Sequence, residues 1–100
     1  MLLHLSLAVM FTLPVIPVAD SVPKFDMVRQ CQSEGGDSPT VDRCVADEKD
    51  ALQQLQTLWA QATAKDRADC TREASGDGTG SYVELQTCLE MNSDVRKARR

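Results

Sequence analysis

Histidine is nearly absent from this chain of 100 residues, because the only one is His4. Beyond that position the chain has no imidazole, which is the usual general base and the commonest metal ligand. The Ser-His and Cys-His nucleophile pairs are excluded with it. No glycine-rich phosphate loop follows a strand, since no stretch alternates apolar and polar residues as a strand would. We therefore predict that the protein is not an enzyme and uses no cofactor.

Charged side chains are missing from residues 1–19, and every Asp, Glu, Lys and Arg stands at Asp20 or later. The stretch from Leu2 to Val18 is almost wholly apolar, which predicts a secretory signal peptide over residues 1–19, cleaved after Ala19 or Ser21. An uncleaved membrane anchor is the alternative, because a span needs about 18 apolar residues. With the signal removed, we expect a periplasmic or secreted chain of bacterial type with no stable membrane span.

Positive charge is also scarce, since 11 Lys and Arg face 15 Asp and Glu, a net charge of −4. An acidic chain is a poor match for nucleic acid, so we expect a protein partner of the envelope or the extracellular space. The cluster of Asp47, Glu48 and Asp50 is predicted to be a solvated surface. The basic residues 96–100 suit the end of a helix, where they complement its dipole, and a docking tail is the alternative interpretation.

Residues 20–100 show helical periodicity throughout and are predicted to form one small all-α domain, a bundle of three to four helices. The expected helices are a short one from Pro23 to about Glu34, a long one from Ser38 to about Ala62, a short one from about Ala64 to Ala74 and a last one from Ser81 to about Lys97. The long helix is broken near Thr63, because an unbroken one would span roughly 54 Å with nothing to cover it.

Aromatic residues are few after the apolar stretch: Phe25, Trp59 and Tyr82. Each lies on an apolar stripe, so all three are predicted in the core. Val28 shares the face of Phe25, and Val95 shares the stripe of Tyr82.

Four cysteines, Cys31, Cys44, Cys70 and Cys88, allow three pairings. Neighbour pairing, Cys31 with Cys44 and Cys70 with Cys88, is favoured because Cys44 with Cys70 would fold the longest helix back on itself. Each closed loop would be worth about 3 kcal/mol. Zinc is the rival use, and the two to four residues that separate paired zinc ligands are not found here.

Residues 75–80 form a glycine-rich turn between the last two predicted helices. Gly76 is predicted to close the first of them in the left-handed conformation, and Gly78 and Gly80 to let the chain turn. Ser81 with Glu84 three residues later has the spacing of a capping box.

The same region can be interpreted as a degenerate EF-hand-like calcium loop over residues 73–84, with glycine at the sixth position. Its candidate ligands are Glu73, Ser75, Asp77, Thr79, Ser81 and Glu84. An ordinary interhelical turn is the preferred interpretation, because the first ligand is Glu rather than Asp and only one such loop is present. A calcium-binding module is the alternative function.

Residues 81–85 and 87–91, preceded by Asp77-Gly78-Thr79, resemble a group of short, exported, four-cysteine helical proteins of bacteria that are uncharacterised. The resemblance extends to the four cysteines and Trp59, and it implies no function.

A second resemblance is to the LprI-like lysozyme-inhibitor family. It rests on the early cysteine pair, on a helix with Gln56 and Trp59, and on Arg67 shortly before Cys70, although the spacing from Trp59 to Arg67 is longer than in that family. The resemblance implies a small helical export product that binds a cell-wall hydrolase. An acidic surface would assist its encounter with a basic lysozyme.

Overall fold

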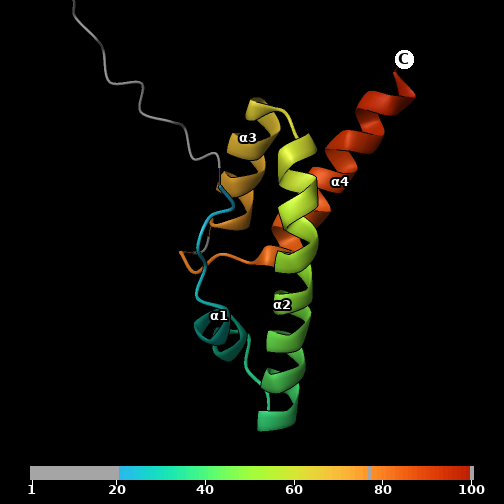
Figure 1. Cartoon of the computed structure of the whole chain (residues 1–100). Helices are drawn as coiled ribbons and strands as arrows, with labels where there is room; N and C mark the ends of the chain where they lie inside the picture. The colour runs from blue at the N-terminus through green and yellow to red at the C-terminus, as the bar shows by residue number, and fades with distance from the viewer. Residues whose placement is uncertain (1–20, 77, 100) are drawn as a thin grey trace, which may run out of the picture.

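The computed structural model describes residues 21–76 and 78–99, and these ranges contain four α-helices and no strand (Figure 1). The helices are α1 (Met27–Ser33), α2 (Ser38–Gln61), α3 (Ala64–Ala74) and α4 (Tyr82–Ala98). The prediction of a small all-α bundle is confirmed. The predicted signal peptide lies outside the described residues.

The core lies between the second half of α2, α3 and the first half of α4 (Figure 1). It consists of Ala51, Leu55, Trp59, Cys70, Ala74, Tyr82, Leu85 and Leu89. The first half of α2 runs on past this core, and α1 packs against it there. We call residues 27–49, which comprise α1 and the first half of α2, the α1–α2 arm.

The first two helices begin at aspartates. Asp26 accepts a hydrogen bond at 3.0 Å from the backbone N–H three residues later, and Asp37 does the same for α2 at 3.0 Å. The predicted start of the first helix at Pro23 was therefore wrong by four residues, while α2 begins at Ser38, as predicted, with Asp37 rather than Ser38 as its N-cap. Each carboxylate satisfies a backbone donor that the first helical turn leaves unpaired, and it so fixes where the helix begins. The stretch before α1 is not helical.

The predicted break after α2 is confirmed. Ala62 has extended backbone angles, and the Thr63 hydroxyl accepts from the backbone N–H of Asp66 at 3.1 Å to start α3. The corner is closed by Arg67, whose Nε donates to the carbonyl of Trp59 at 2.8 Å and whose guanidinium lies 5.5 Å from the indole ring centre. The Thr63 cap, the hydrogen bond of Arg67 and its contact with the Trp59 ring all stabilise the same turn, at which the chain reverses direction.

Both predicted disulfides are present. Cys31–Cys44 ties α1 to α2 with a Cα–Cα distance of 5.7 Å, and Cys70–Cys88 ties α3 to α4 with a distance of 5.5 Å. Each bond therefore joins two helices that are consecutive in the chain. One bond therefore fixes the first half of α2, and the other fixes the pair of α3 and α4.

The turn from α3 to α4 differs from the prediction in one respect. Positive φ angles occur at Gly78 (89°) and Gly80 (76°), but not at Gly76, so Gly76 does not close α3 in the left-handed conformation. Ser75 is the C-cap instead. Gly80 is required for a second reason, because a Cβ there would lie 2.6 Å from Cε1 of Phe25.

Of the two hydrogen bonds of the capping box predicted at the start of α4, the one accepted by Ser81 is present. The Ser81 hydroxyl accepts from the backbone N–H of Glu84 at 3.3 Å. The backbone N–H of Ser81 donates to the carbonyl of Ala74 at 3.1 Å, so that donor is satisfied by the end of α3.

The aromatic core prediction is confirmed, since Trp59 and Tyr82 are buried and Phe25 packs against the core. Val28 and Val95, which were predicted on apolar faces, are each 50% exposed. The second half of α4 extends beyond the other helices, and α1 has only α2 beside it (Figure 1).

Candidate functional site

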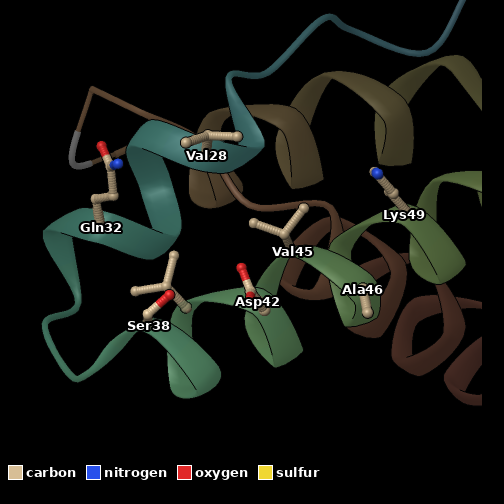
Figure 2. Close-up of a pocket in the computed structure, with 8 residues that line it drawn as sticks. Val28, Gln32, Ser38, Asp42, Val45, Ala46 and Lys49 are labelled. Carbon is tan, nitrogen blue, oxygen red and sulfur yellow. The ribbon is translucent and has the colours of Figure 1, made fainter.

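A groove of about 570 Å³ runs between α1 and α2 along the α1–α2 arm (Figure 2). Its apolar part consists of Val28 from α1 with Val41 and Val45 from α2. Val28 is half exposed and the two α2 valines are half-buried. Figure 2 shows Val28 and Val45 facing one another across the groove. The groove stays open because α1, with 7 residues, covers only part of the α2 surface beside it.

Polar side chains border the valines. Gln32 and Ser38 lie toward one end of the groove, Asp42 lies near its middle, and Lys49 lies at the other end (Figure 2). Residues 21–76 and 78–99 contain no histidine, so none of them offers Ser38 an imidazole. An apolar strip with a mixed polar border suits the docking of a side chain or a short segment.

The arm that carries this groove is held rigidly. The Cys31–Cys44 bond joins its two helices, and the short link between them turns through Gly35 and Gly36, with φ angles of 82° and 111°. Asp37 then caps α2 and also accepts from the Thr40 hydroxyl at 2.6 Å. A groove that is already formed loses less conformational freedom on binding than a flexible one, which favours affinity.

The arm is also acidic. Residues 27–49 contain five Asp and Glu against three Lys and Arg, a net charge of −2, which is half that of the whole chain. The hydrogen bonds from the hydroxyl and the backbone N–H of Thr40 lower the pKa of Asp37, so this carboxylate is charged at neutral pH. The field around the groove is therefore negative and favours a positively charged partner.

One carboxylate of this region was predicted wrongly. Glu48 is not solvated, since it is only 4% exposed and accepts hydrogen bonds from the Ser81 hydroxyl at 2.7 Å and the Tyr82 backbone N–H at 2.6 Å. It therefore joins the arm to the first turn of α4, where a helix dipole favours a negative charge. Asp47 and Asp50 are exposed, as predicted.

Among the described candidate calcium ligands, two carboxylates are exposed and three hydroxyls are hydrogen-bonded within the protein. Glu73 and Glu84 are exposed, and Asp77 lies outside the described residues. Three hydroxyls bond within the protein: Ser75 to the Thr71 carbonyl, Thr79 to the Gln30 side chain, and Ser81 to Glu48. Across residues 21–76 and 78–99, no three His, Cys, Asp or Glu side chains are grouped so that they could hold a metal ion. Calcium binding stays a prediction, which calorimetric titration with calcium would test.

The segment before α1 is fixed to α4 by a contact that sequence reasoning missed. The Tyr82 hydroxyl accepts from the Phe25 backbone N–H at 2.7 Å and donates to the Pro23 carbonyl at 2.9 Å, and the two rings lie 4.9 Å apart. Only the aromatic pair gave a sign of it in the sequence, because both rings were predicted in the core. This contact holds the base of the arm against the core.

Within the part of the chain that the structure describes, no helix has both the length and the apolar character needed to cross a membrane. Comparison with protein-family models, with curated proteins and with solved structures finds no match.

Proposed function

We propose that this chain is an exported, non-catalytic binding protein, and that the groove of the α1–α2 arm is the place where a basic protein partner docks. The observation that carries the proposal is the half-open strip of Val28, Val41 and Val45 on a rigid, disulfide-closed arm.

Apolar side chains that stay exposed in a polar border are typical of an interaction site. Val28 is 50% exposed although it faces Val45, so a partner's side chain laid between them would remove apolar surface of both from water. Burying such surface contributes about 25 cal/mol per Å². Gln32, Ser38, Asp42 and Lys49 border the strip and supply the hydrogen bonds and charges that fix orientation.

The charge of the arm indicates the class of partner. A net charge of −2 over the arm, residues 27–49, accelerates encounter with a basic protein and disfavours an acidic one. The likeness to the lysozyme-inhibitor family makes a basic cell-wall hydrolase of the lysozyme type the first partner to test.

The two disulfides support the exported location. Such bonds persist in oxidising compartments and are rare in the cytosol, so a chain that depends on two of them fits the periplasm or the exterior.

The test is a direct one, with purified lysozyme as the probe and calorimetry and inhibition of cell-wall lysis as readouts. Val28→Glu places a carboxylate in the strip at an exposed position, so folding is kept and binding should weaken by about 10-fold or more. Met91→Glu is the matched control, because Met91 is 62% exposed on α4 and lies outside the groove. The control should bind lysozyme as the wild type does.

Two results would contradict the proposal. One is the absence of binding to lysozyme and to other basic cell-wall hydrolases at concentrations up to about 1 mM. The other is binding that Val28→Glu and Met91→Glu weaken equally, since this would place the contact outside the groove.

A further inference from the structure

Helix α4 carries an apolar stripe that no part of the described chain covers. Val83, Met91 and Val95 are 41%, 62% and 50% exposed. With Thr87 they are spaced by four residues, so they follow one side of the helix. The buried residues of α4, Tyr82, Leu85 and Leu89, lie on its other side.

Two hollows between α3 and α4 continue this stripe and have opposite charges. The first, of about 320 Å³, lies beside Val83 and Met91 and is bordered by Glu73 and Glu84. The second, of about 430 Å³, lies beside Val95 and is bordered by two cations, Lys65 and Arg96, and by one carboxylate, Asp66, so its border has a net charge of +1. The face shared by α3 and α4 therefore has an acidic end and a basic end with apolar side chains at both.

The two helices run antiparallel, which fixes the order of these groups. Cys70 is bonded to Cys88, and Asp66 forms an ion pair with Arg96, so the start of α3 lies beside the end of α4. Lys65 accordingly shares a hollow with Val95.

We propose that this face of α3 and α4 is an interface between two copies of the chain, with the two α4 helices antiparallel about a two-fold axis. Val83 of one copy then packs against Val95 of the other, and Thr87 against Met91. Glu73 and Glu84 of each copy lie opposite Lys65 of its partner. The proposal does not depend on the partner proposed for the α1–α2 arm.

The pattern suits a second copy because a two-fold interface must hold each contact twice. The apolar stripe is symmetric about Leu89, since Val83 and Val95 stand six residues to either side of it and Thr87 and Met91 stand two. Reversing the direction of α4 therefore places the stripe on itself, with apolar residues against apolar residues.

The charges have the same symmetry. On α3, Lys65 and Glu73 stand four residues to either side of Asp69. Lys65 pairs with Asp69 of its own chain at 2.7 Å, and reversal brings Glu73 of the other copy to the same ammonium group. Such surface pairs select the partner and its orientation more than they add affinity.

The size of the face indicates a weak dimer. A helix of 17 residues is about 25 Å long, and two packed helices about 10 Å apart present a face about 20 Å wide. Two such faces bury about 1,000 Å², the lower end of the range for specific interfaces. We therefore expect monomer and dimer to exchange at micromolar concentration.

The first test is sedimentation of the oxidised protein over a range of concentrations. The wild type should pass from monomer to dimer, and Met91→Glu should raise the dissociation constant by about 10-fold or more, because it buries an unpaired carboxylate against Thr87 of the other copy. Met91 is 62% exposed in the single chain, so the variant keeps its fold. Val28→Glu is the matched control on the arm and should dimerise as the wild type does.

A charge exchange then tests the antiparallel arrangement. Glu73→Lys and Lys65→Glu are both changes at exposed positions, and each new charge also suits the dipole of α3 at its position. Either variant alone should dimerise more weakly, because like charges meet at both ends of the interface. An equal mixture of the two should form a heterodimer, in which opposite charges meet at both ends.

The proposal is overturned if the wild type stays monomeric up to about 1 mM. A dimer that Met91→Glu leaves unchanged would also overturn it, because the contact would then lie on another face. A mixture of the two charge variants that associates no better than either variant alone would exclude the antiparallel arrangement.

Discussion

Removing the Glu48 carboxylate should destabilise the protein more than any other single change at an acidic residue. Glu48→Ala leaves the Ser81 hydroxyl and the Tyr82 backbone N–H without their acceptor, and both residues are buried, at 4% and 3% exposure. Any replacement of the two hydrogen bonds would have to come from water that enters the hollow of about 300 Å³ lined by residue 48 and Ser81.

The size of the effect follows from the two hydrogen bonds. A hydrogen bond to a charged group contributes about 1.5–3 kcal/mol, and the desolvation of the buried carboxylate offsets part of that gain. We expect a loss of about 3 kcal/mol in the free energy of unfolding, which is a large part of the 5–15 kcal/mol that a domain typically has. Glu48→Gln should lose less, because the amide oxygen still accepts one of the two bonds.

Urea denaturation of the oxidised protein, followed by circular dichroism, measures this loss. Asp47→Ala is the control, since Asp47 is the exposed neighbour, and it should change the free energy by less than about 0.5 kcal/mol. Adding Ser81→Ala to Glu48→Ala should cost less than the sum of the single changes, because the two residues share one bond. A loss below about 1 kcal/mol for Glu48→Ala would refute the reasoning.

Three further predictions concern the ends of helices and the turn before α4. Gly80→Ala should lower the free energy of unfolding by about 2 kcal/mol or more, because the new Cβ collides with the Phe25 ring and the backbone has a positive φ. Gly78→Ala has no atom within 4 Å of its Cβ, so it should lose only the roughly 1–2 kcal/mol that a positive φ costs a residue with a side chain. Equal losses in urea denaturation would contradict this prediction. Tyr82→Phe should lower the free energy of unfolding by about 1 kcal/mol, because the Tyr82 hydroxyl is hydrogen-bonded to two backbone groups of the segment before α1. Hydrogen exchange of the Phe25 backbone amide should also become faster, and an unchanged exchange rate would contradict the contact. Folding lowers the pKa of Asp37 from 3.8, so the stabilisation that its carboxylate gives α2 is present above that pH and is lost as the pH falls through the lowered pKa. The backbone amide signals of the first turn of α2 should therefore shift on acid titration in the wild type and not in Asp37→Asn. Identical titrations of the two proteins would disprove it.

Much of the fold was predictable because it depends on local chemistry. The break at Thr63 and the start of α4 at Ser81 follow from side chains that cap a helix within three residues. The cysteine pairing follows from the short turns between consecutive helices. The start of α1 was predicted four residues early because Pro23 is also a good helix-start residue, and sequence alone does not decide between neighbouring start signals.

The features that were missed depend on which surface meets which. Glu48 stands four residues after Cys44 and three before Ala51, so its position lies on the buried stripe of α2. Because glutamate is charged, we predicted it at the surface in spite of this spacing. Val28 and Val95 have helical spacing but no helix to cover them, and periodicity does not show where a neighbouring element ends. The open groove and the open stripe on α4 are both consequences of such endings.

The two open surfaces lie on different elements, and this separation gives a last prediction. A dimer formed through α3 and α4 leaves both α1–α2 arms free, so one dimer would present two grooves. When both grooves of a dimer bind ligand molecules on the same surface, the apparent affinity rises by about 10² to 10⁴, provided that the spacing of the grooves permits both contacts. Neither groove needs any new contact for this gain. Met91→Glu should therefore weaken binding to a dense layer of immobilised lysozyme, yet leave the affinity for dissolved lysozyme unchanged.

Val28→Glu should weaken both measurements, because it alters the groove itself. Surface plasmon resonance at high and low ligand density, compared with calorimetry in solution, distinguishes the two variants. If Met91→Glu weakened binding in solution as much as on the layer, the α4 stripe would belong to the partner's contact, and the division of the molecule into a binding arm and a pairing face would be wrong.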